Sequence, residues 1–420
     1  MSAPETHRTI EAVWRMESPR VIATLARMTR DVGAAEDLAQ DALLVALEQW
    51  PVQGVPRNPA AWLVTTAKRR AIDQLRAAAR HEEKHAQIGR ELDELVGAAQ
   101  DERDEALDDP IGDDLLRLVF TACHPVLASE ARVALTLKLL GGLSTAEIAR
   151  AFLAREETIA QRIVRAKKTL ADAHVPYEVP RGDELPQRLA SVLEVIYLVF
   201  NEGYAATAGD DWMRPGLCED ALRLGRVLAG LLPLEAEVHG LVALMELQAS
   251  RIGARTAADG TPILLLEQDR GRWDRLLIGR GLQGLARAEE LEPGRGPYAL
   301  QAAIAACHAR ARRAQETDWS RIAALYAGLM LVAPSPVIER NRAVAVAMAF
   351  GAQAGLDLTD ALQGEKALAG YHLLPSVRGD LLAKLGRNDE ARAEFARAAS
   401  MTRNARERAL LLERAQGGKA

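Results

Sequence analysis

Residues 144–170 read STAEIARAFLAREETIAQRIVRAKKTL and predict two helices joined by a short break. Ser144 and Glu147 have the spacing of a capping box, in which each side chain satisfies a free amide at the start of a helix. Apolar residues then recur at helical spacing up to Phe152 and, after the break, in a second helix over about residues 156–170. We expect each helix to bury one face, so that the pair forms a helix-turn-helix.

The outer side of the second helix combines short polar groups with cations. Such side chains can read base edges in the major groove and hold phosphates. They are Thr158, Gln161, Arg162, Arg165, Lys167 and Lys168. An amphipathic helix pair in any helical protein can carry a solvated basic face, so this pattern alone leaves DNA binding open.

The composition of the whole chain predicts an all-α protein. Its 420 residues are 49% hydrophobic and 26% charged, which suffices for substantial cores and for roughly two to four domains. Ala, Leu, Arg and Glu recur at helical spacing, whereas alternating Val-Ile-Thr patterns are few. The net charge is -5, so any contact with nucleic acid must come from local basic patches.

Several functional classes find no support in the sequence. Cys123, Cys218 and Cys307 lie far apart, which indicates neither a disulfide framework nor a structural zinc site. There is no Gly-rich phosphate loop, no supported Ser-His-Asp order and no metal-ligand spacing, so we expect no enzyme, cofactor or metal. The chain shows neither a leader nor a long apolar run, and we expect a cytoplasmic protein with no membrane partner.

A helix predicted over about residues 35–50 carries a stripe of acidic and amide side chains. They share one side because steps of three, four and seven residues return to the same face of a helix. The stripe consists of Asp37, Gln40, Asp41 and Glu48. It is either a solvated surface or a face that docks on a basic partner.

The next predicted helix, over about residues 60–80, is the second basic element. Asn58 is placed to cap it and Pro59 to begin it. Trp62 is either a core residue or an aromatic surface on which an unpaired base stacks beside cations. The basic side chains are Lys68, Arg69, Arg70, Arg76 and Arg80.

These motifs resemble a known family in their order and spacing. Residues 36–42 (EDLAQDA) and 61–76, with AWL at the start and KRRAIDQLR at the end, resemble region 2 of bacterial sigma factors of the extracytoplasmic-function type. The helix-turn-helix, with Leu143-Ser144, Glu147-Ile148-Ala149 and Arg165-Ala166-Lys167, is similar to their region 4. Two independent motifs in the right order make the resemblance specific.

The resemblance implies a role for each matching position. Docking on core RNA polymerase, at the clamp helices of its largest subunit, is implied for Asp37, Gln40, Asp41, Leu44 and Glu48. Melting of the -10 promoter element and capture of its strand are implied for Trp62, Lys68, Arg69, Arg70 and Arg76. Reading of the -35 element is implied for Arg155, Glu156, Thr158, Gln161, Arg162, Arg165 and Lys167. The polymerase flap is a further implied contact.

Three positions depart from the family pattern. Arg69 stands where many relatives have Asn, which leaves open the -10 base that would be captured. In the helix-turn-helix break, Leu153 replaces the usual Gly and Arg155 the usual small cap. The turn must therefore avoid positive φ or accept strain.

We expect four segments: residues 1–80 and 115–175, which the resemblance assigns to sigma regions 2 and 4, an acidic linker over residues 81–114, and a long helical extension over residues 176–420. The linker is most simply solvated, and the resemblance implies that it threads polymerase channels. His81 and His85 are one helical turn apart, but no third ligand accompanies them, so we expect them to face solvent.

The extension is again predicted to be helical, in blocks over residues 217–231, 235–251, 273–288, 298–312, 319–332 and 338–350. Its final block, about residues 381–398, resembles a tetratricopeptide repeat, with Leu385-Gly386, Ala391 and Phe395 at matching offsets. The whole plan resembles the sigma-factor subgroup with a tetratricopeptide-like C-terminal extension. We expect the extension to bind a protein partner or a ligand.

Two clusters in the extension combine polar, charged and aromatic residues. They lie at residues 201–204 with 210–212, and at residues 267–275. Either cluster could line a pocket, and the simpler interpretation is a salt-bridge network between helices around core tryptophans.

The sequence thus predicts a sigma factor that directs transcription initiation at promoters and whose C-terminal domain regulates it. The alternative is an ordinary helix-turn-helix regulator that senses a ligand or a partner. Such a regulator has no need of the Asp37 stripe or of the helix that carries Trp62. A third possibility is a repeat-built adaptor in which both basic helices are only surfaces.

Overall fold

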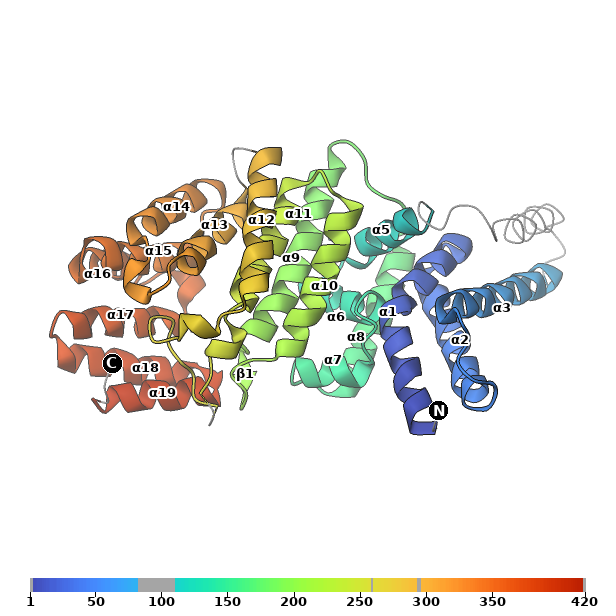
Figure 1. The fold of residues 1–420 in the computed structure, drawn as a ribbon, viewed down its shortest axis with the longest axis horizontal. Helices are drawn as coiled ribbons and strands as arrows, with labels where there is room; N and C mark the ends of the chain where they lie inside the picture. The colour runs from blue at the N-terminus through green and yellow to red at the C-terminus, as the bar shows by residue number, and fades with distance from the viewer. Residues whose placement is uncertain (1–2, 82–109, 258–259, 293–295, 418–420) are drawn as a thin grey trace. The chain divides into compact units, whose positions relative to one another are not determined.

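The computed structural model of the chain describes residues 3–81, 110–257, 260–292 and 296–417, without the side chains of residues 3–4, 74–81 and 110–113. The predicted acidic linker lies almost wholly outside the described residues. The chain divides into two compact units, residues 1–195 and 196–420. The all-α prediction is confirmed, since almost every described element is a helix (Figure 1). No described helix is both long and apolar enough to cross a membrane.

Three helices open the first unit: α1 (Ala3–Thr29), α2 (Val32–Gln53) and α3 (Pro59–His81). The Asp31 side chain caps α2 by accepting hydrogen bonds from the amides of Gly33 and Ala34 at 2.6 and 3.1 Å. Asn58 caps α3 as predicted, by accepting from the amide of Ala61 at 3.1 Å. The three helices pack against one another around a shared core, whose largest fully buried side chains are Ile10, Ile22, Leu25, Leu38, Trp50 and Leu63.

The second half of this unit comprises α5 (Pro110–Ala122), α6 (Ser129–Leu139), α7 (Thr145–Ala151) and α8 (Glu156–Asp172). The capping box at Ser144 is present: its hydroxyl accepts from the Glu147 amide at 3.2 Å, and the Glu147 carboxylate accepts from the Ser144 amide at 2.8 Å. Ile148 of α7 and Ile159 of α8 are fully buried. The helix-turn-helix prediction is therefore confirmed.

Helix α9 (Glu184–Tyr204) begins in the first unit and ends in the second. Its first turns complete the core of the first unit, because Arg188 donates to the carbonyl of Phe120 at 2.9 Å and Ser191 to that of Cys123 at 2.6 Å. The N-terminal unit therefore extends beyond the helix-turn-helix.

The second unit is a succession of helices that each pack on the next. They are α10 (Pro215–Leu231), α11 (Ala236–Ala249), α12 (Arg275–Leu291), α13 (Pro297–Arg310), α14 (Trp319–Val332), α15 (Pro336–Phe350), α16 (Ala352–Ala361), α17 (Leu373–Lys384), α18 (Asn388–Met401) and α19 (Ala405–Ala415). The six helical blocks expected between residues 217 and 350 all form, with ends within three residues of those predicted.

The final block of the extension consists of two helices, α17 and α18, that pack against each other. Gly386 turns the chain at φ 75°, a conformation that favours glycine. A Cβ at Gly379 would lie 2.8 Å from the Phe395 ring, so the absence of a side chain lets the two helices approach closely. The assignment of this block to the tetratricopeptide family stays a prediction.

Two very short strands connect distant parts of the second unit. β1 (Ala208–Gly209) pairs in parallel with β2 (Arg403–Asn404). The Asn404 amide also donates to the carbonyls of Ala206 and Asp211 at 3.1 and 2.9 Å. The last helices therefore return to the start of the unit, a closure that the helical periodicity did not predict.

Candidate polymerase and nucleic-acid interface

The predicted docking stripe on α2 is partly exposed and partly engaged. Asp37, Leu44 and Glu48 face solvent, with 80% of the Asp37 side chain and 57% of Leu44 exposed. Gln40 and Asp41 are half-buried. The structure thus places an acidic and apolar surface on α2, which suits a basic partner with some apolar area.

Helix α3 presents the side chains predicted to handle the -10 element. Arg69 and Arg70 are exposed and Lys68 is half-buried, whereas Arg76 lies in α3 but its side chain is outside the described residues. Trp62 is half-buried with its ring edge-on to Trp50, 5.3 Å between centroids. Trp62 therefore packs on the core on one side and keeps part of its surface in solvent, and its contact with an unpaired base stays a prediction.

A salt bridge joins the two predicted sites on α2 and α3. The Arg70 guanidinium lies 2.9 Å from the Asp41 carboxylate, and both side chains are about two-fifths exposed. In this conformation Asp41 and Arg70 neutralise each other, while Arg69 stays exposed.

The turn between α7 and α8 contains a strained backbone conformation. Leu153 has φ 49°, a left-handed conformation that is unfavourable for a residue with a Cβ. Arg155 occupies the N-cap position of α8 without a side-chain hydrogen bond. The departure from glycine thus leaves the motif intact at a cost in backbone energy.

Helix α8 turns most of its predicted -35 side chains outward. Arg155, Glu156, Thr158, Gln161 and Arg165 are exposed, and Arg162 is half-buried. They share a face because Ile159, Ile163, Ala166 and Leu170 bury the opposite one. The geometry suits insertion of one helix face into a groove of duplex DNA.

Lys167 differs from the other side chains of α8, because it contacts α2. Its ammonium lies 2.5 Å from the Glu36 carboxylate and 3.9 Å from that of Asp37. Lys138 of α6 approaches the same Glu36 carboxylate at 3.5 Å, and Gln40 donates to it at 2.6 Å. Glu36 is buried, so two cations and an amide surround one carboxylate where α2 meets α6 and α8.

Sequence reasoning missed Glu36 and Lys138 as functional candidates. Glu36 belongs to the quoted EDLAQDA motif, where it falls on the buried side of α2 with Ala35 and Leu38. An acidic residue on an apolar helix face was the available signal. Its cationic partners, Lys138 and Lys167, lie more than a hundred residues further along the chain, and no local pattern connects them with Glu36.

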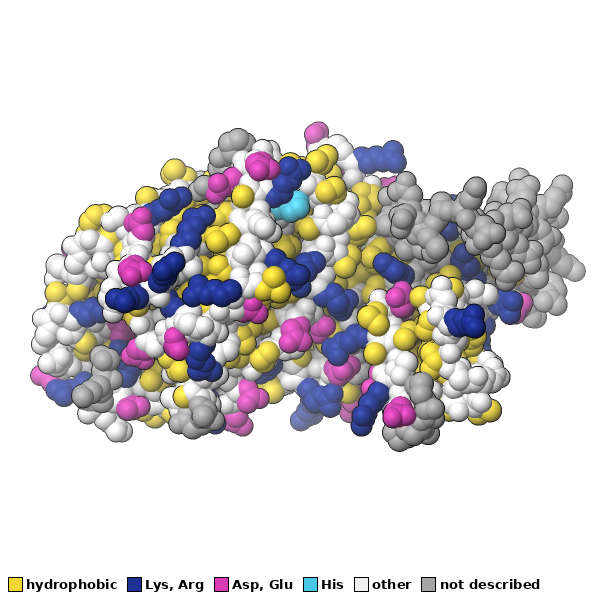
Figure 2. Space-filling model, in the orientation of Figure 1, with side chains coloured by type: hydrophobic (Ala, Val, Ile, Leu, Met, Phe, Trp, Pro, Cys, Tyr) yellow, Lys and Arg dark blue, Asp and Glu magenta, His cyan; other side chains and the backbone are white. Residues whose placement is uncertain are grey.

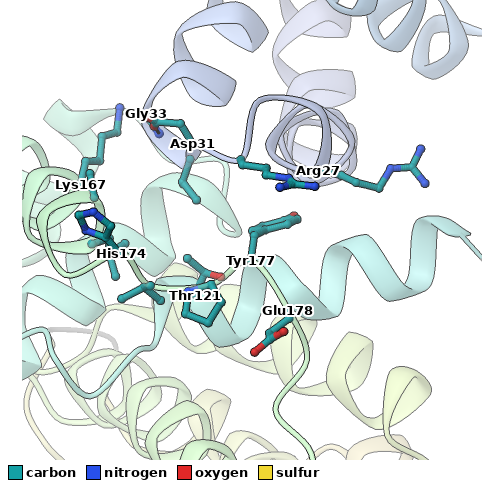
Figure 3. Close-up of a pocket in the computed structure, with 14 residues that line it drawn as sticks. Arg27, Asp31, Gly33, Thr121, Lys167, His174, Tyr177 and Glu178 are labelled. Atoms are coloured by element: carbon teal, nitrogen blue, oxygen red, sulfur yellow. Dashed lines mark hydrogen bonds between the residues drawn. The ribbon is translucent and has the colours of Figure 1, made fainter. Parts of the chain in front are cut away.

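Cavities lie on both sides of this contact. One of about 870 Å³ is bounded by Arg27, Asp31, Lys167, His174 and Tyr177, among others, and Figure 3 shows Lys167 and His174 on the side opposite Arg27 and Tyr177. The other, of about 840 Å³, reaches from Arg15 to Lys138 and Glu147. The ion pairs around Glu36 therefore form a narrow polar bridge rather than a continuous packed interface.

A second polar contact holds α1 to α5 at the edge of the first cavity. Tyr177 donates to the carbonyls of Ala23 and Asp114 at 3.0 and 2.9 Å, and Arg27 lies 3.3 Å from the Asp114 carboxylate. Burial raises the pKa of Tyr177 far above its ordinary value, so its hydroxyl stays a donor.

Charge on the visible surface is mixed. In Figure 2 the described Lys and Arg side chains lie among Asp and Glu side chains and do not merge into one basic patch on that face. This distribution agrees with the net charge of -5 and with nucleic-acid contact through local groups only.

Comparison with known proteins places these regions in sequence families. Residues 13–81 match Sigma-70 region 2, residues 117–170 match Sigma-70 region 4, and residues 188–289 match a family of unknown function (DUF6596). An uncharacterized protein of Rhizobium meliloti (strain 1021) is 42% identical over 398 residues, which cover 94% of this chain and 92% of that protein.

Two characterised relatives match the first part of the chain. The ECF RNA polymerase sigma factor SigK of Mycobacterium ulcerans (strain Agy99) is 32% identical over 158 residues, 36% of this chain and 78% of that protein. SigK of Mycobacterium tuberculosis (strain ATCC 25618 / H37Rv) is 31% identical over 157 residues, with the same coverage.

Proposed function

This chain belongs to the extracytoplasmic-function sigma factors, and from that premise we propose how its residues divide the work of starting transcription. The family binds core RNA polymerase and promoter DNA and directs transcription initiation. Membership of this family argues against a simple helix-turn-helix regulator and against a repeat-built adaptor, because neither kind of protein needs sigma region 2. The cytoplasm, where polymerase and promoters meet, is the proposed location.

The exposed face of α2 docks on the clamp helices of the largest polymerase subunit. Asp37 and Glu48 supply charge and Leu44 supplies apolar area, all three of them solvent-exposed. Exposed charges mainly steer the encounter, and an apolar side chain buried at the centre of an interface adds affinity.

A double substitution tests the docking face. Asp37→Arg with Gln40→Ala should reduce co-purification with core polymerase by tenfold or more, because the added cation meets a basic partner. Asp183→Arg, at an exposed position outside α2, is the matched control and should bind normally. Unchanged binding by a folded double variant would remove α2 from the interface.

Helix α3 stabilises the separated -10 strand, and α8 reads the -35 duplex. Trp62 keeps part of its ring in solvent beside Lys68 and Arg69, a combination that suits unstacked bases next to phosphates. Arg162 and Arg165 on α8 hold duplex phosphates, while Thr158 and Gln161 face base edges. The polymerase flap supports α8 in this arrangement.

The ion pairs of Lys138 and Lys167 with Glu36 exist in the free protein, before it binds a promoter. The -35 and -10 positions are about 25 base pairs apart, roughly 85 Å along duplex DNA at 3.4 Å per pair. Regions 2 and 4 cannot span that distance while Lys167 lies 2.5 Å from Glu36. Promoter binding must therefore break these ion pairs. A DNA phosphate then takes the place of Glu36 beside Lys167, and core polymerase contacts α2.

The C-terminal unit, residues 196–420, regulates this activity. It has its own cores, and the relative that is similar over nearly the full length shares it. Helix α9 follows region 4 in the chain and continues into this unit, so a change in the unit can reach region 4 through a shared helix.

Reconstituted transcription tests the proposal as a whole. Purified full-length protein, core polymerase and fragmented host DNA should yield new RNA 5′ ends that share -35 and -10 patterns, relative to core polymerase alone. The fragment 1–195, which keeps Arg188 and Ser191 in the first unit, should differ from full length in the yield of those starts. No new starts from either protein would contradict the promoter assignment, and equal yields would contradict a regulatory C-terminal unit.

A further inference from the structure

A cavity of about 240 Å³ lies inside the second unit, between α11, α13, α14 and α15. One part of its wall is apolar, made by Leu244, Leu247, Leu265, Ile304, Leu329 and Ile338. The rest is polar, and it contains no carboxylate among the described residues that form it. Among the described residues of this wall, Arg251 is the one cation.

Arg251 has no acidic partner among the residues that the structure describes. Directly after α11, its guanidinium donates to the Tyr204 hydroxyl and lies 5.7 Å from the Tyr204 ring centroid and 5.6 Å from that of Trp273. No carboxylate of the described residues comes within ion-pair distance of it. The two aromatic residues belong to the clusters singled out from the sequence, and they fix the direction of a charge that borders the cavity.

Two neighbouring arginines add to the positive field and donate hydrogen bonds to groups outside the cavity wall or to backbone carbonyls. Arg255 donates to the carbonyl of Tyr204, and its guanidinium stacks 3.6 Å from the Tyr204 ring centroid. Arg270 donates to the carbonyls of His308 and Ala311 at 2.9 and 3.0 Å and to the Thr317 hydroxyl at 2.9 Å. Neither forms an ion pair with a described carboxylate, and buried cations without a counter-charge are costly.

Unused hydrogen-bonding groups accompany Arg251 in the cavity wall. His308 is only 8% exposed, and its Nδ1 atom is buried with no hydrogen-bond partner among described residues. Burial, Arg251 and Arg270 lower the pKa of His308 to about 3, so its ring is neutral at physiological pH. Burial raises the pKa of Tyr326 to about 12, so its hydroxyl keeps its proton and can donate.

We propose that this cavity binds a small organic carboxylate, with its anionic group on Arg251 and its apolar body against Leu247, Ile304 and Leu329. The volume equals about eight waters at roughly 30 Å³ each, which fits a ligand of about ten non-hydrogen atoms. A single guanidinium matches one carboxylate, whereas the second negative charge of a dianionic phosphate would meet no further cation among the described residues of the wall. Binding at this site does not depend on the sigma-factor assignment. Any effect of the ligand on transcription rests on the proposed regulation.

Calorimetry on the full-length chain tests the proposal with benzoate and hexanoate as probes. Their neutral analogues, benzamide and hexanamide, have similar shape without the charge. We expect each carboxylate to bind at least tenfold more tightly than its amide. Absence of binding by both carboxylates, or equal binding by the amides, would overturn the proposal without any variant. Tighter binding of phenyl phosphate than of benzoate would overturn the carboxylate assignment.

Three variants locate the site. Arg251→Gln removes the charge, and Ala305→Phe fills the cavity while leaving every charge in place. Each should weaken benzoate binding at least tenfold, and the exposed matched control Arg280→Gln should not change it. Thermal unfolding identifies a variant that fails to fold, in which case the other decides. Wild-type affinity in a folded Arg251→Gln or Ala305→Phe protein would place the ligand elsewhere and contradict the proposal.

Discussion

The basic side chains that matter most in the two units differ in what surrounds them. In the first unit, Lys167 and Lys138 meet Glu36, and Arg70 meets Asp41. Around the cavity of the second unit, Arg251 and its neighbours lie on aromatic rings and backbone carbonyls, with no described carboxylate at ion-pair distance. The first arrangement can exchange one anion for another, such as a phosphate. The arrangement in the second unit holds positive charge inside the protein, where it either stabilises the fold or binds an anionic ligand.

The largest effect should come from removing a buried arginine of the second unit. Arg270→Gln loses three charge-assisted hydrogen bonds and removes the donor from one buried and one part-buried carbonyl, so the free energy of unfolding should fall by about 3 kcal/mol or more. Urea unfolding followed by tryptophan fluorescence measures this, because Trp273 lies 5.1 Å from the Arg270 guanidinium.

The exposed Arg280 supplies the control for that experiment. Arg280→Gln should change the free energy of unfolding by less than about 0.5 kcal/mol, as for surface substitutions in general. An Arg270→Gln protein as stable as this control would show that the buried arginines do not hold the second unit together.

Acid should destabilise the second unit more than the first. The folded pKa of His308, about 3, lies below its unfolded value near 6.5, so between these pH values the unfolded chain binds a proton that the folded chain does not. Stability is therefore complete above pH 6.5 and falls as the pH drops towards 3. From pH 6.5 to 4 the loss should reach up to about 3 kcal/mol at 1.36 kcal/mol per pH unit.

The counterpart in the first unit is His124, whose pKa burial lowers to about 4 and whose side chain is half-exposed. Its smaller shift predicts a smaller loss. His308→Phe, which keeps a ring against Trp319, should flatten the pH dependence of the second unit. Equal acid sensitivity of wild type and His308→Phe would remove His308 as its cause.

The smallest effect concerns the strained turn of the helix-turn-helix. Leu153 is 56% exposed at φ 49°, so Leu153→Gly relieves strain and loses little burial. The free energy of unfolding of the first unit should rise by about 0.5–1 kcal/mol. Thermal unfolding measures the change, and a lower midpoint than wild type would show that Leu153 packing outweighs its strain.

Local patterns predicted most of the fold. The Ser144 capping box, the Asn58 cap and the apolar spacing of α8 are short-range features, and each appears in the structure as expected. Local patterns did not predict that Asn404 would join the end of the second unit to its beginning, because its hydrogen-bond partners Ala206 and Asp211 lie nearly two hundred residues earlier.

The candidate sites were predictable only in part, for the same reason. The exposed faces of α2, α3 and α8 follow from periodicity, but the Glu36 bridge depends on tertiary contact. The arginine cluster did leave a trace in the sequence. Arg270 belongs to the charged cluster singled out at residues 267–275, whereas Arg251 and Arg255 lie outside any α-helix and gave no local signal.

The separation between α2 and α8 is the measurement that tests the exchangeable bridge most directly. Labels on Val52→Cys in α2, at a position 85% exposed, and on the exposed Asp172→Cys at the end of α8 suit fluorescence transfer, because the three native cysteines are buried. We predict one narrow distribution of distances in the free protein, an increase of several tens of Å on loading with core polymerase and promoter DNA, and a partly opened free state in Glu36→Gln. A distance in a transcribing complex equal to that in the free protein would contradict the account.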